Sequence, residues 1–130
     1  MTAFVDTNIL IRHLTGDPPD LARRATRFLA ATEPLFLTDL IVAEVIYVLE
    51  SVYAVGRDDV GQLMRDVLTS DRMRLADLPI LLRAIEIYQF DRLSFADAYL
   101  VACAERSGDG RVVSFDKAIS RVGTVERIEP

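Results

Sequence analysis

Phe4-Val5-Asp6-Thr7-Asn8 begins as a short apolar run and stops at a carboxylate, a hydroxyl and an amide. The apolar residues predict a buried strand over residues 2–6, and the run 9–14 predicts a helix directly after it. A carboxylate at the carboxyl end of such a strand lies on the edge where open α/β sheets bind their ligands. Asp6 is therefore the first candidate site residue of the chain.

Further apolar strands alternate with helical segments along the rest of the chain. Strands separated by helices predict a parallel sheet that helices cover on both faces, so the expected fold class is α/β. The remaining strands are expected at residues 35–37, 72–77, 111–115 and 124–128.

Capping residues mark where the helices are expected to begin. Asp17 is the expected N-cap of a helix that has Pro18 at its first position, and Thr38 caps a helix that closes at Gly56. Ser94-Phe95-Ala96-Asp97 matches a capping box. The expected helices span residues 9–14, 18–31, 39–55, 58 or 59 to 68, 79–88 and 94–106, with a short one that Asp116 opens.

The length and hydropathy of the chain restrict the class of protein to which it can belong. The chain has 130 residues, enough for one domain with a real core, and a single domain over residues 1–130 is expected. Its longest apolar stretch, 40–49, is interrupted by Glu44 and is shorter than the roughly 20 residues that span a bilayer. The N-terminus lacks the pattern of an export signal. We therefore expect no membrane association and a cytoplasmic location.

Charge and the rare residue types restrict the chemistry. A net charge of −5 repels nucleic acid, so a nucleic-acid substrate would require local positive charge such as a bound divalent cation. The single cysteine, Cys103, excludes an intrachain disulfide, and with the single histidine, His13, it offers no ligand set for structural zinc. Both are interpreted as structural. Catalysis is therefore expected to depend on carboxylates.

Four carboxylates have apolar sequence neighbours on one or both sides, and all four are expected to be at least half buried. Removing a carboxylate from water is costly unless it is paired or binds a cation. Asp6 and Asp116 follow strands, and the other two lie on helices that begin near the same edge of the sheet, so the four are expected to converge. Oxygen ligands of this kind suit Mg²⁺ or Mn²⁺. The four residues are Asp6, Glu44, Asp97 and Asp116.

Each of these acids also has a structural interpretation. Asp6 and Asp116 are possible helix N-caps, and Asp97 is a possible partner of Ser94 in the capping box. Glu44 is neither a cap nor part of a polar helix face, and a salt bridge to an arginine of another helix would explain it. The local sequence leaves both interpretations open.

Residues next to the candidate acids in the sequence bear on which chemistry the site can perform. Thr7 or Asn8 beside Asp6 can orient a water molecule at a metal. Asn8 occupies the position where a phosphatase of the haloacid dehalogenase type has a second acid, and Lys117 lies in the wrong element for a phosphorelay receiver. The sequence does not say which arginines border a nucleic-acid cleft, the candidates being Arg12, Arg23, Arg24, Arg27 and Arg92.

The chain resembles a PIN-domain ribonuclease of the VapC type, the toxin of bacterial toxin–antitoxin pairs. The resemblance covers nearly the whole chain. It rests on Phe-Val-Asp-Thr-Asn-Ile-Leu at 4–10, Ala-Glu-Val at 43–45, Ser-Phe-Ala-Asp-Ala at 94–98 and Ser-Phe-Asp-Lys at 114–117. It implies a PIN-like α/β/α sandwich whose five-stranded parallel sheet has the strand order 3-2-1-4-5.

The resemblance also implies a function. It implies a metal-dependent endoribonuclease that uses Mg²⁺ or Mn²⁺, forms a homodimer and is inhibited by a cognate VapB-type antitoxin. By matching position its acidic quartet falls on the four carboxylates named above, and Thr7 or Asn8 and Ser114 are accessory. The alternative is a non-catalytic PIN-like protein whose acidic cluster docks a basic partner.

Overall fold

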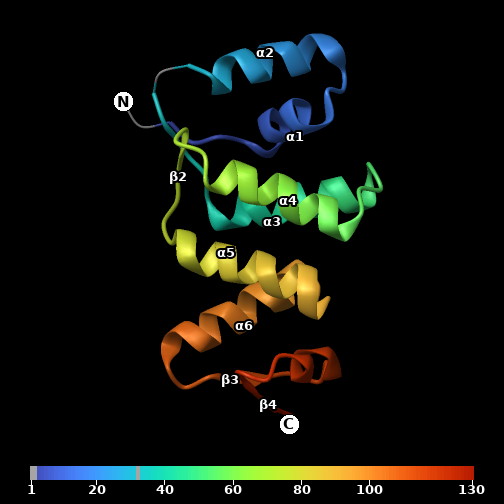
Figure 1. The fold of residues 1–130 in the computed structure, drawn as a ribbon, viewed down its shortest axis with the longest axis vertical. Coiled ribbons are helices and arrows are strands. Elements are labelled where there is room, and N and C mark those ends of the chain that lie inside the picture. The colour runs from blue at the N-terminus through green and yellow to red at the C-terminus, as the bar shows by residue number, and fades with distance from the viewer. Residues whose placement is uncertain (1–2, 32) are drawn as a thin grey trace. The chain divides into compact units, whose positions relative to one another are not determined.

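The computed structural model describes residues 3–31 and 33–130 (Figure 1). Its contacts group the chain into two compact units, Met1–Ala76 and Asp77–Pro130. The single domain over residues 1–130 therefore stays a prediction. Among the helices of the described residues, none is both long enough and apolar enough to cross a membrane.

Parallel strand pairs organise the first unit. Phe4 forms a parallel bridge with Phe36, and the Val5 N–H donates to the Phe36 carbonyl at 2.9 Å. Strand β1 pairs in parallel with β2, with Leu35 opposite Met73. The first expected strand segment therefore pairs with the second, and the second pairs with the third. Residue 2 of the first segment lies outside the described residues. The elements of this unit are α1 (Thr7–Thr15), α2 (Pro19–Leu29), β1 (Leu35–Phe36), α3 (Asp39–Ser51), α4 (Arg57–Leu68) and β2 (Met73–Arg74).

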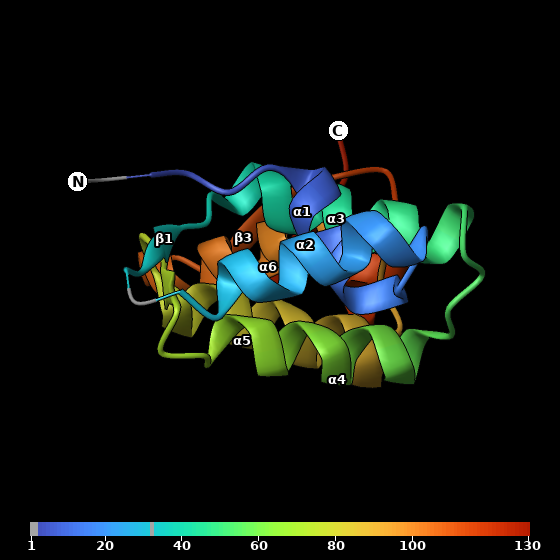
Figure 2. The same cartoon turned by 90° about the horizontal axis from the view of Figure 1, so that it is seen from above.

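One face of α3 forms the centre of the first unit's core. Val42, Val45, Ile46 and Leu49 recur at helical spacing and are at most 1% exposed. Helix α3 packs against α1 and α4, and α1 packs against α2. Figure 2 shows α1 next to α3. Full burial of each such side chain contributes about 1.5–3 kcal/mol relative to leaving it in water. The opposite face of α3, which carries Glu44, consequently remains at the surface.

The second unit pairs two helices and two short strands. Helices α5 and α6 pack against each other (Figure 1), and β3 pairs in parallel with β4, with Arg111 opposite Glu126. A π-helical turn, η1, directly continues α5 and ends at Asp91, before Arg92, whose φ of 61° is left-handed. The elements are α5 (Leu78–Glu86), η1 (Ile87–Asp91), α6 (Phe95–Ser107), β3 (Arg111–Val113), η2 (Lys117–Arg121) and β4 (Glu126–Ile128).

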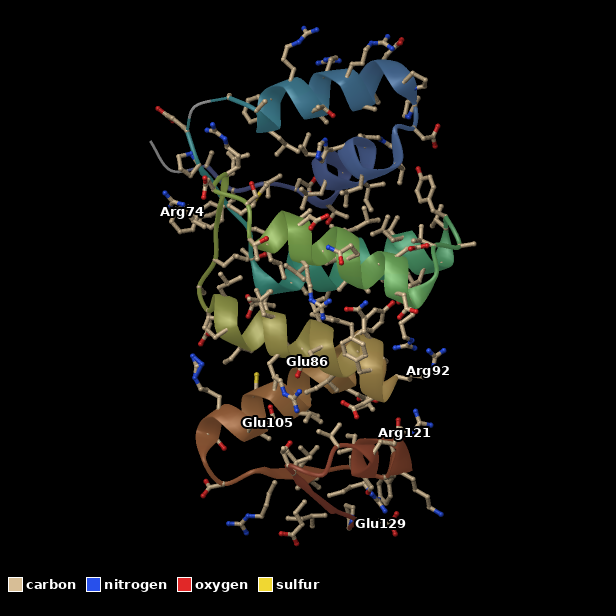
Figure 3. All side chains as sticks on the ribbon, viewed as in Figure 1. Arg74, Glu86, Arg92, Glu105, Arg121 and Glu129 are labelled. Atoms are coloured by element: carbon tan, nitrogen blue, oxygen red, sulfur yellow. The ribbon has the colours of Figure 1, made fainter. Side chains whose placement is uncertain are left out.

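An ion pair ties α6 to α5. Arg83 donates to both carboxylate oxygens of Glu105 through Nε and Nη2, each at 2.9 Å, and it also binds Glu86. Glu86 and Glu105 are labelled on their neighbouring helices in Figure 3. The Arg83 guanidinium lowers the pKa of Glu105, and a hydrogen bond from Thr124 lowers it further. The partial burial of Glu105 acts in the opposite direction but is outweighed. A bidentate pair of this kind fixes geometry, so α6 is held in register beside α5.

The structure corrects several expected helix boundaries. Pro18, not Asp17, is the N-cap of α2, because a residue before a proline avoids the helical region and Pro19 then takes the first helical position. Helix α3 ends at Ser51, before Ala54 adopts a left-handed φ of 52°. Gly56 does not close α3 but is the N-cap of α4, which begins at Arg57, one or two residues earlier than expected.

The strands are shorter than expected. Met73–Arg74 and Arg111–Val113 replace the longer runs 72–77 and 111–115. Asp77 does not belong to a strand, because its side chain accepts a hydrogen bond from the Ile80 N–H at 3.1 Å and caps α5. The parallel direction of the pairs agrees with the α/β expectation. A single five-stranded sheet with the order 3-2-1-4-5 stays a prediction.

Candidate functional site

Asp6 lies where the chain leaves its first extended segment. Val5 before it is buried, whereas Asp6 itself is exposed and forms the N-cap of α1. Its Oδ1 accepts a hydrogen bond from the Thr7 N–H at 2.8 Å. The capping interpretation of Asp6 is thus confirmed. The helix cap occupies only Oδ1 of Asp6, so Oδ2 can still bind a ligand.

Thr7 connects this segment to Glu44. The Thr7 side chain is buried, and its Oγ1 donates to Glu44 Oε2 at 2.5 Å, joining α1 to α3. In the described part of the chain Glu44 forms no ion pair, so the salt bridge considered for it is not found. The accessory residue Thr7 therefore contacts Glu44 directly and fixes one of its two oxygens.

Removing the Thr7 hydroxyl is expected to lower the metal-dependent ribonuclease activity that the resemblance implies, without unfolding the protein. Thr7→Val preserves the shape of the side chain but frees Glu44, and losing such a supporting contact typically costs about 10- to 100-fold. The measurement is kcat and KM on one RNA substrate. Thr7→Ser retains the hydroxyl and should restore most of the kcat. Equal activity of the valine and serine variants would contradict this role.

Asp97 and Asp116 form the second pair of acids. Ser94 is the N-cap of α6 and accepts from the Asp97 N–H at 3.2 Å, which places Asp97 in the first turn. Asp116 is the N-cap of η2 and accepts from the Ala118 N–H at 2.9 Å. Ser114 Oγ accepts from the Asp116 N–H at 2.9 Å and so supports this cap. These local contacts fix the backbone of Asp97 in the first turn of α6 and hold one carboxylate oxygen of Asp116.

The two carboxyl groups lie within hydrogen-bonding reach of each other. Partial burial, and then the hydrogen bond and negative charge of Asp116, raise the pKa of Asp97, while a hydrogen bond with Ser94 acts in the opposite direction. Two acids this close resist simultaneous ionisation. A bound cation would remove the repulsion between the two carboxylates, so the pair is suited to bind one.

The expectation that all four acids are at least half buried is wrong. Asp6, Glu44 and Asp116 are exposed, and only Asp97 is intermediate. The reason is geometric: successive residues on a helix point about 100° apart, so Glu44 does not share the inward face of its apolar neighbours. The two caps lie at helix ends on the surface. Burial cost is consequently no argument for a cation at these three residues.

The carboxylates fit a hard divalent cation by their chemistry, since oxygen donors are what Mg²⁺ and Mn²⁺ prefer. Asp6 and Glu44 belong to the first unit, and Asp97 and Asp116 to the second. Within residues 3–31 and 33–130, no three His, Cys, Asp or Glu side chains are grouped so that they could hold a metal ion. The structure thus brings together Asp97 and Asp116, and the four-carboxylate site stays a prediction.

The remaining candidates have different environments. Asn8 is exposed on α1 and lines a hollow of about 360 Å³ together with Arg12, Arg24 and others. His13 Nδ1 lies 2.8 Å from Thr26 Oγ1, a contact that joins α1 to α2. Cys103 is a partly buried free thiol. The contact of His13 is consistent with its structural interpretation.

Tyr47 is a residue that the sequence analysis did not single out. It lies one helical turn after Glu44 and is 68% exposed. The available signal was its spacing of three residues from a candidate acid, which places both on one helix face.

Comparison with known proteins identifies the class. The PIN domain family matches residues 3–125, so the chain belongs to the PIN domain family. This membership implies an α/β/α fold. The chain is also similar to the VapC ribonuclease of Aquifex aeolicus, with 25% identity over 123 residues that cover 92% of this chain and 91% of that protein. The resemblance to a PIN-domain protein of the VapC type is thus confirmed.

Proposed function

We propose that this protein is a metal-dependent endoribonuclease and the toxin of a type II toxin–antitoxin system. Asp6, Glu44, Asp97 and Asp116 together would hold one or two Mg²⁺ or Mn²⁺ ions. The observation that carries the proposal is the pair of Asp97 and Asp116, two carboxyl groups within hydrogen-bonding reach in a chain of the PIN family. Two carboxylates this close repel each other when both are ionised, and a bound cation would balance their charge.

The proposed mechanism is hydrolysis of an RNA phosphodiester bond. A bound divalent ion supplies charge neutralisation at the phosphate and lowers the pKa of water. The caps hold Asp6 and Asp116 in position, so their oxygens need little reorganisation when they bind. Asp6, Asp97 and Asp116 are the proposed direct ligands. Glu44, anchored by Thr7, either joins them or orients the attacking water.

Local positive charge supports RNA as the substrate, in a chain whose net charge is −5. Arg92 and Arg121 are exposed and belong to the same unit as Asp97 and Asp116 (Figure 3). Arg121 Nη1 donates to the Arg92 carbonyl at 3.2 Å, which holds the two residues near each other. We assign these guanidinium groups to phosphate contacts, which position the backbone without reading the sequence.

The proposed partners and location rest on the family membership and on the similarity to a VapC ribonuclease. In this proposal the protein acts on RNA in the cytoplasm as a homodimer under the control of a VapB-type antitoxin. The hollow that Arg12, Arg24 and Phe28 help to line, with Phe28 60% exposed, offers apolar contact and positive charge to such a partner. Large exposed apolar side chains beside charged ones are typical of interaction surfaces.

The function is tested with purified protein that is free of any partner. We expect cleavage of structured RNA in the presence of Mn²⁺, loss of cleavage on chelation with EDTA, and recovery when Mn²⁺ is added back. Glu44→Gln should lower the rate, with Glu129→Gln near the C-terminus as a control of equal charge change. Binding of basic peptides without cleavage of any RNA would instead favour the non-catalytic binding protein.

A further inference from the structure

An arginine of the last strand holds the chain segment that carries Asp116. Arg127 lies on β4, which pairs with β3. Its Nη1 donates to the Ser114 carbonyl at 3.0 Å, and its Nε donates to Ser120 Oγ at 3.1 Å. Ser114 lies two residues before Asp116, and Ser120 lies four residues after it. One guanidinium group therefore bridges the two sides of this segment.

The contacts of Arg127 add to the local ones that Asp116 makes. Ser114 Oγ accepts from the Asp116 N–H, and Asp116 Oδ1 accepts from the Ala118 N–H, each at 2.9 Å. Both bonds span two residues, so they orient Asp116 only within its own turn. Arg127 reaches the same segment from a different strand, seven positions from Ser120 and 13 from Ser114. It thereby connects the turn to the sheet.

The ion pair of Arg127 does not explain why its guanidinium is largely buried. The Arg127 side chain is 16% exposed, whereas its partner Glu129, at 3.0 Å, is 52% exposed. A pair with so exposed an acid contributes little to stability. Burying a charged group is costly, and an apolar side chain of similar size often stabilises a fold equally well. An apolar side chain cannot donate to two acceptors in fixed directions, as the planar guanidinium does.

We propose that Arg127 is a positioning residue, which holds Asp116 where it contributes to the binding of a divalent cation. This inference rests on the proposed function, because Asp116 is one of the proposed metal ligands. Ligands that are held in place by outer contacts need little reorganisation when they bind. Loss of Arg127 should therefore weaken metal binding and lower kcat, while the KM for RNA stays unchanged.

Binding of Mn²⁺ without RNA provides the first test. The free aqueous ion has an EPR signal that is lost on binding, so a titration gives the Kd. Arg127→Met keeps a long side chain without a donor and should raise this Kd about 10- to 100-fold. Arg111→Met removes the same charge from an exposed position on β3 and should leave the Kd unchanged. Equal Kd values for these two variants would overturn the proposal.

Amide hydrogen exchange of the metal-free protein tests the position of Asp116 itself. The Ala118 N–H is bound by Asp116 Oδ1, so its exchange rate reports whether the carboxylate stays in place. Arg127→Met should accelerate this exchange several-fold. The Ile80 N–H, which Asp77 accepts in the same unit, is the internal reference and should be unaffected. Equal acceleration at both amides would indicate a general loss of stability and contradict a positioning role.

Two milder substitutions keep the proposal testable if Arg127→Met does not fold. Arg127→Lys retains the positive charge but lacks the planar fork, and Ser120→Ala removes one acceptor from an exposed position. Each should raise the Kd for Mn²⁺ in the same direction as Arg127→Met, by a smaller factor. A parent-like Kd in both variants would mean that the bridge does not position Asp116.

RNA cleavage separates this inference from the proposed function. If the parent cleaves RNA while Arg127→Met and Arg111→Met have the same kcat and the same Kd for Mn²⁺, the positioning role is wrong and the nuclease assignment stands. If Arg127→Met weakens Mn²⁺ binding but no form of the protein cleaves RNA, the positioning role stands and the nuclease assignment fails.

Discussion

Asp6→Asn is expected to reduce metal-dependent RNA cleavage by at least about 10³-fold while leaving the fold intact, as for loss of a group that stabilises charge at the reacting centre. Asparagine is as good an N-cap as aspartate, so it can still accept the Thr7 N–H and begin α1. The substitution removes only the negative charge that a divalent ion requires. The measurement is the single-turnover cleavage rate at saturating Mn²⁺, together with the thermal midpoint.

This substitution separates the two interpretations of Asp6. If Asp6 is only a helix cap, the asparagine variant should cleave RNA like the parent. Asp20→Asn is the matched control, because it removes the same charge from α2, where Asp20 forms an exposed pair with Arg23 at 2.8 Å. Exposed pairs contribute little to stability, so both the cleavage rate and the thermal midpoint of this control should be nearly unchanged.

Asp97→Asn is expected to act in opposite directions on stability and on activity. Partial burial and the neighbouring Asp116 raise the pKa of Asp97, so its ionised form is less favourable in the folded protein than in the unfolded chain. Removing that charge should raise the Tm of the metal-free protein by about 2–4 °C at neutral pH. It should also lower cleavage by about 10²- to 10³-fold, because a proposed ligand is lost.

The pH dependence of this stabilisation has a defined sign. A raised carboxyl pKa costs stability once the pH exceeds the folded-state pKa, and the cost disappears below the ordinary pKa of aspartate, where the group is protonated in both states. The Tm difference between Asp97→Asn and the parent should therefore shrink as the pH falls. A saturating concentration of Mn²⁺ should stabilise the parent more than the variant.

Asp59→Asn provides the matched control for Asp97→Asn. Asp59 also lies in the first turn of a helix, α4, where a negative charge interacts favourably with the helix dipole. Its replacement should lower the Tm slightly, the opposite sign to Asp97→Asn. If both variants lower the Tm, repulsion between Asp97 and Asp116 does not govern the stability of the metal-free site.

Local signals predicted most elements of the fold. The Thr38 cap of α3 and the Ser94 cap of α6 are confirmed, because each depends on one side chain and the backbone N–H three residues later. Boundaries were less certain where two signals compete. At Pro18-Pro19 the second proline excludes the first from the helix, and at Asp77 a helix cap takes a residue that the pattern assigned to a strand.

The candidate acids illustrate a different limit. Their assignment to the acidic quartet rests on the resemblance to the PIN family; the family itself is confirmed, and the quartet stays a prediction. Their burial was inferred from adjacent residues, which fails on a helix because adjacent side chains point in different directions. The contact of Thr7 with Glu44 joins residues 37 positions apart in the chain, and no local pattern indicates it.

The sequence by itself determined the family and the alternation of helices with strands, and it selected Asp6, Glu44, Asp97 and Asp116 as candidate acids. These depend on residue types and short spacings, which act locally. Only the tertiary structure decided that Asp6, Glu44 and Asp116 are exposed, that Thr7 anchors Glu44, and that Asp97 and Asp116 approach each other. Exposure and contact between distant residues depend on how whole elements pack, because packing selects which face of each helix meets the core.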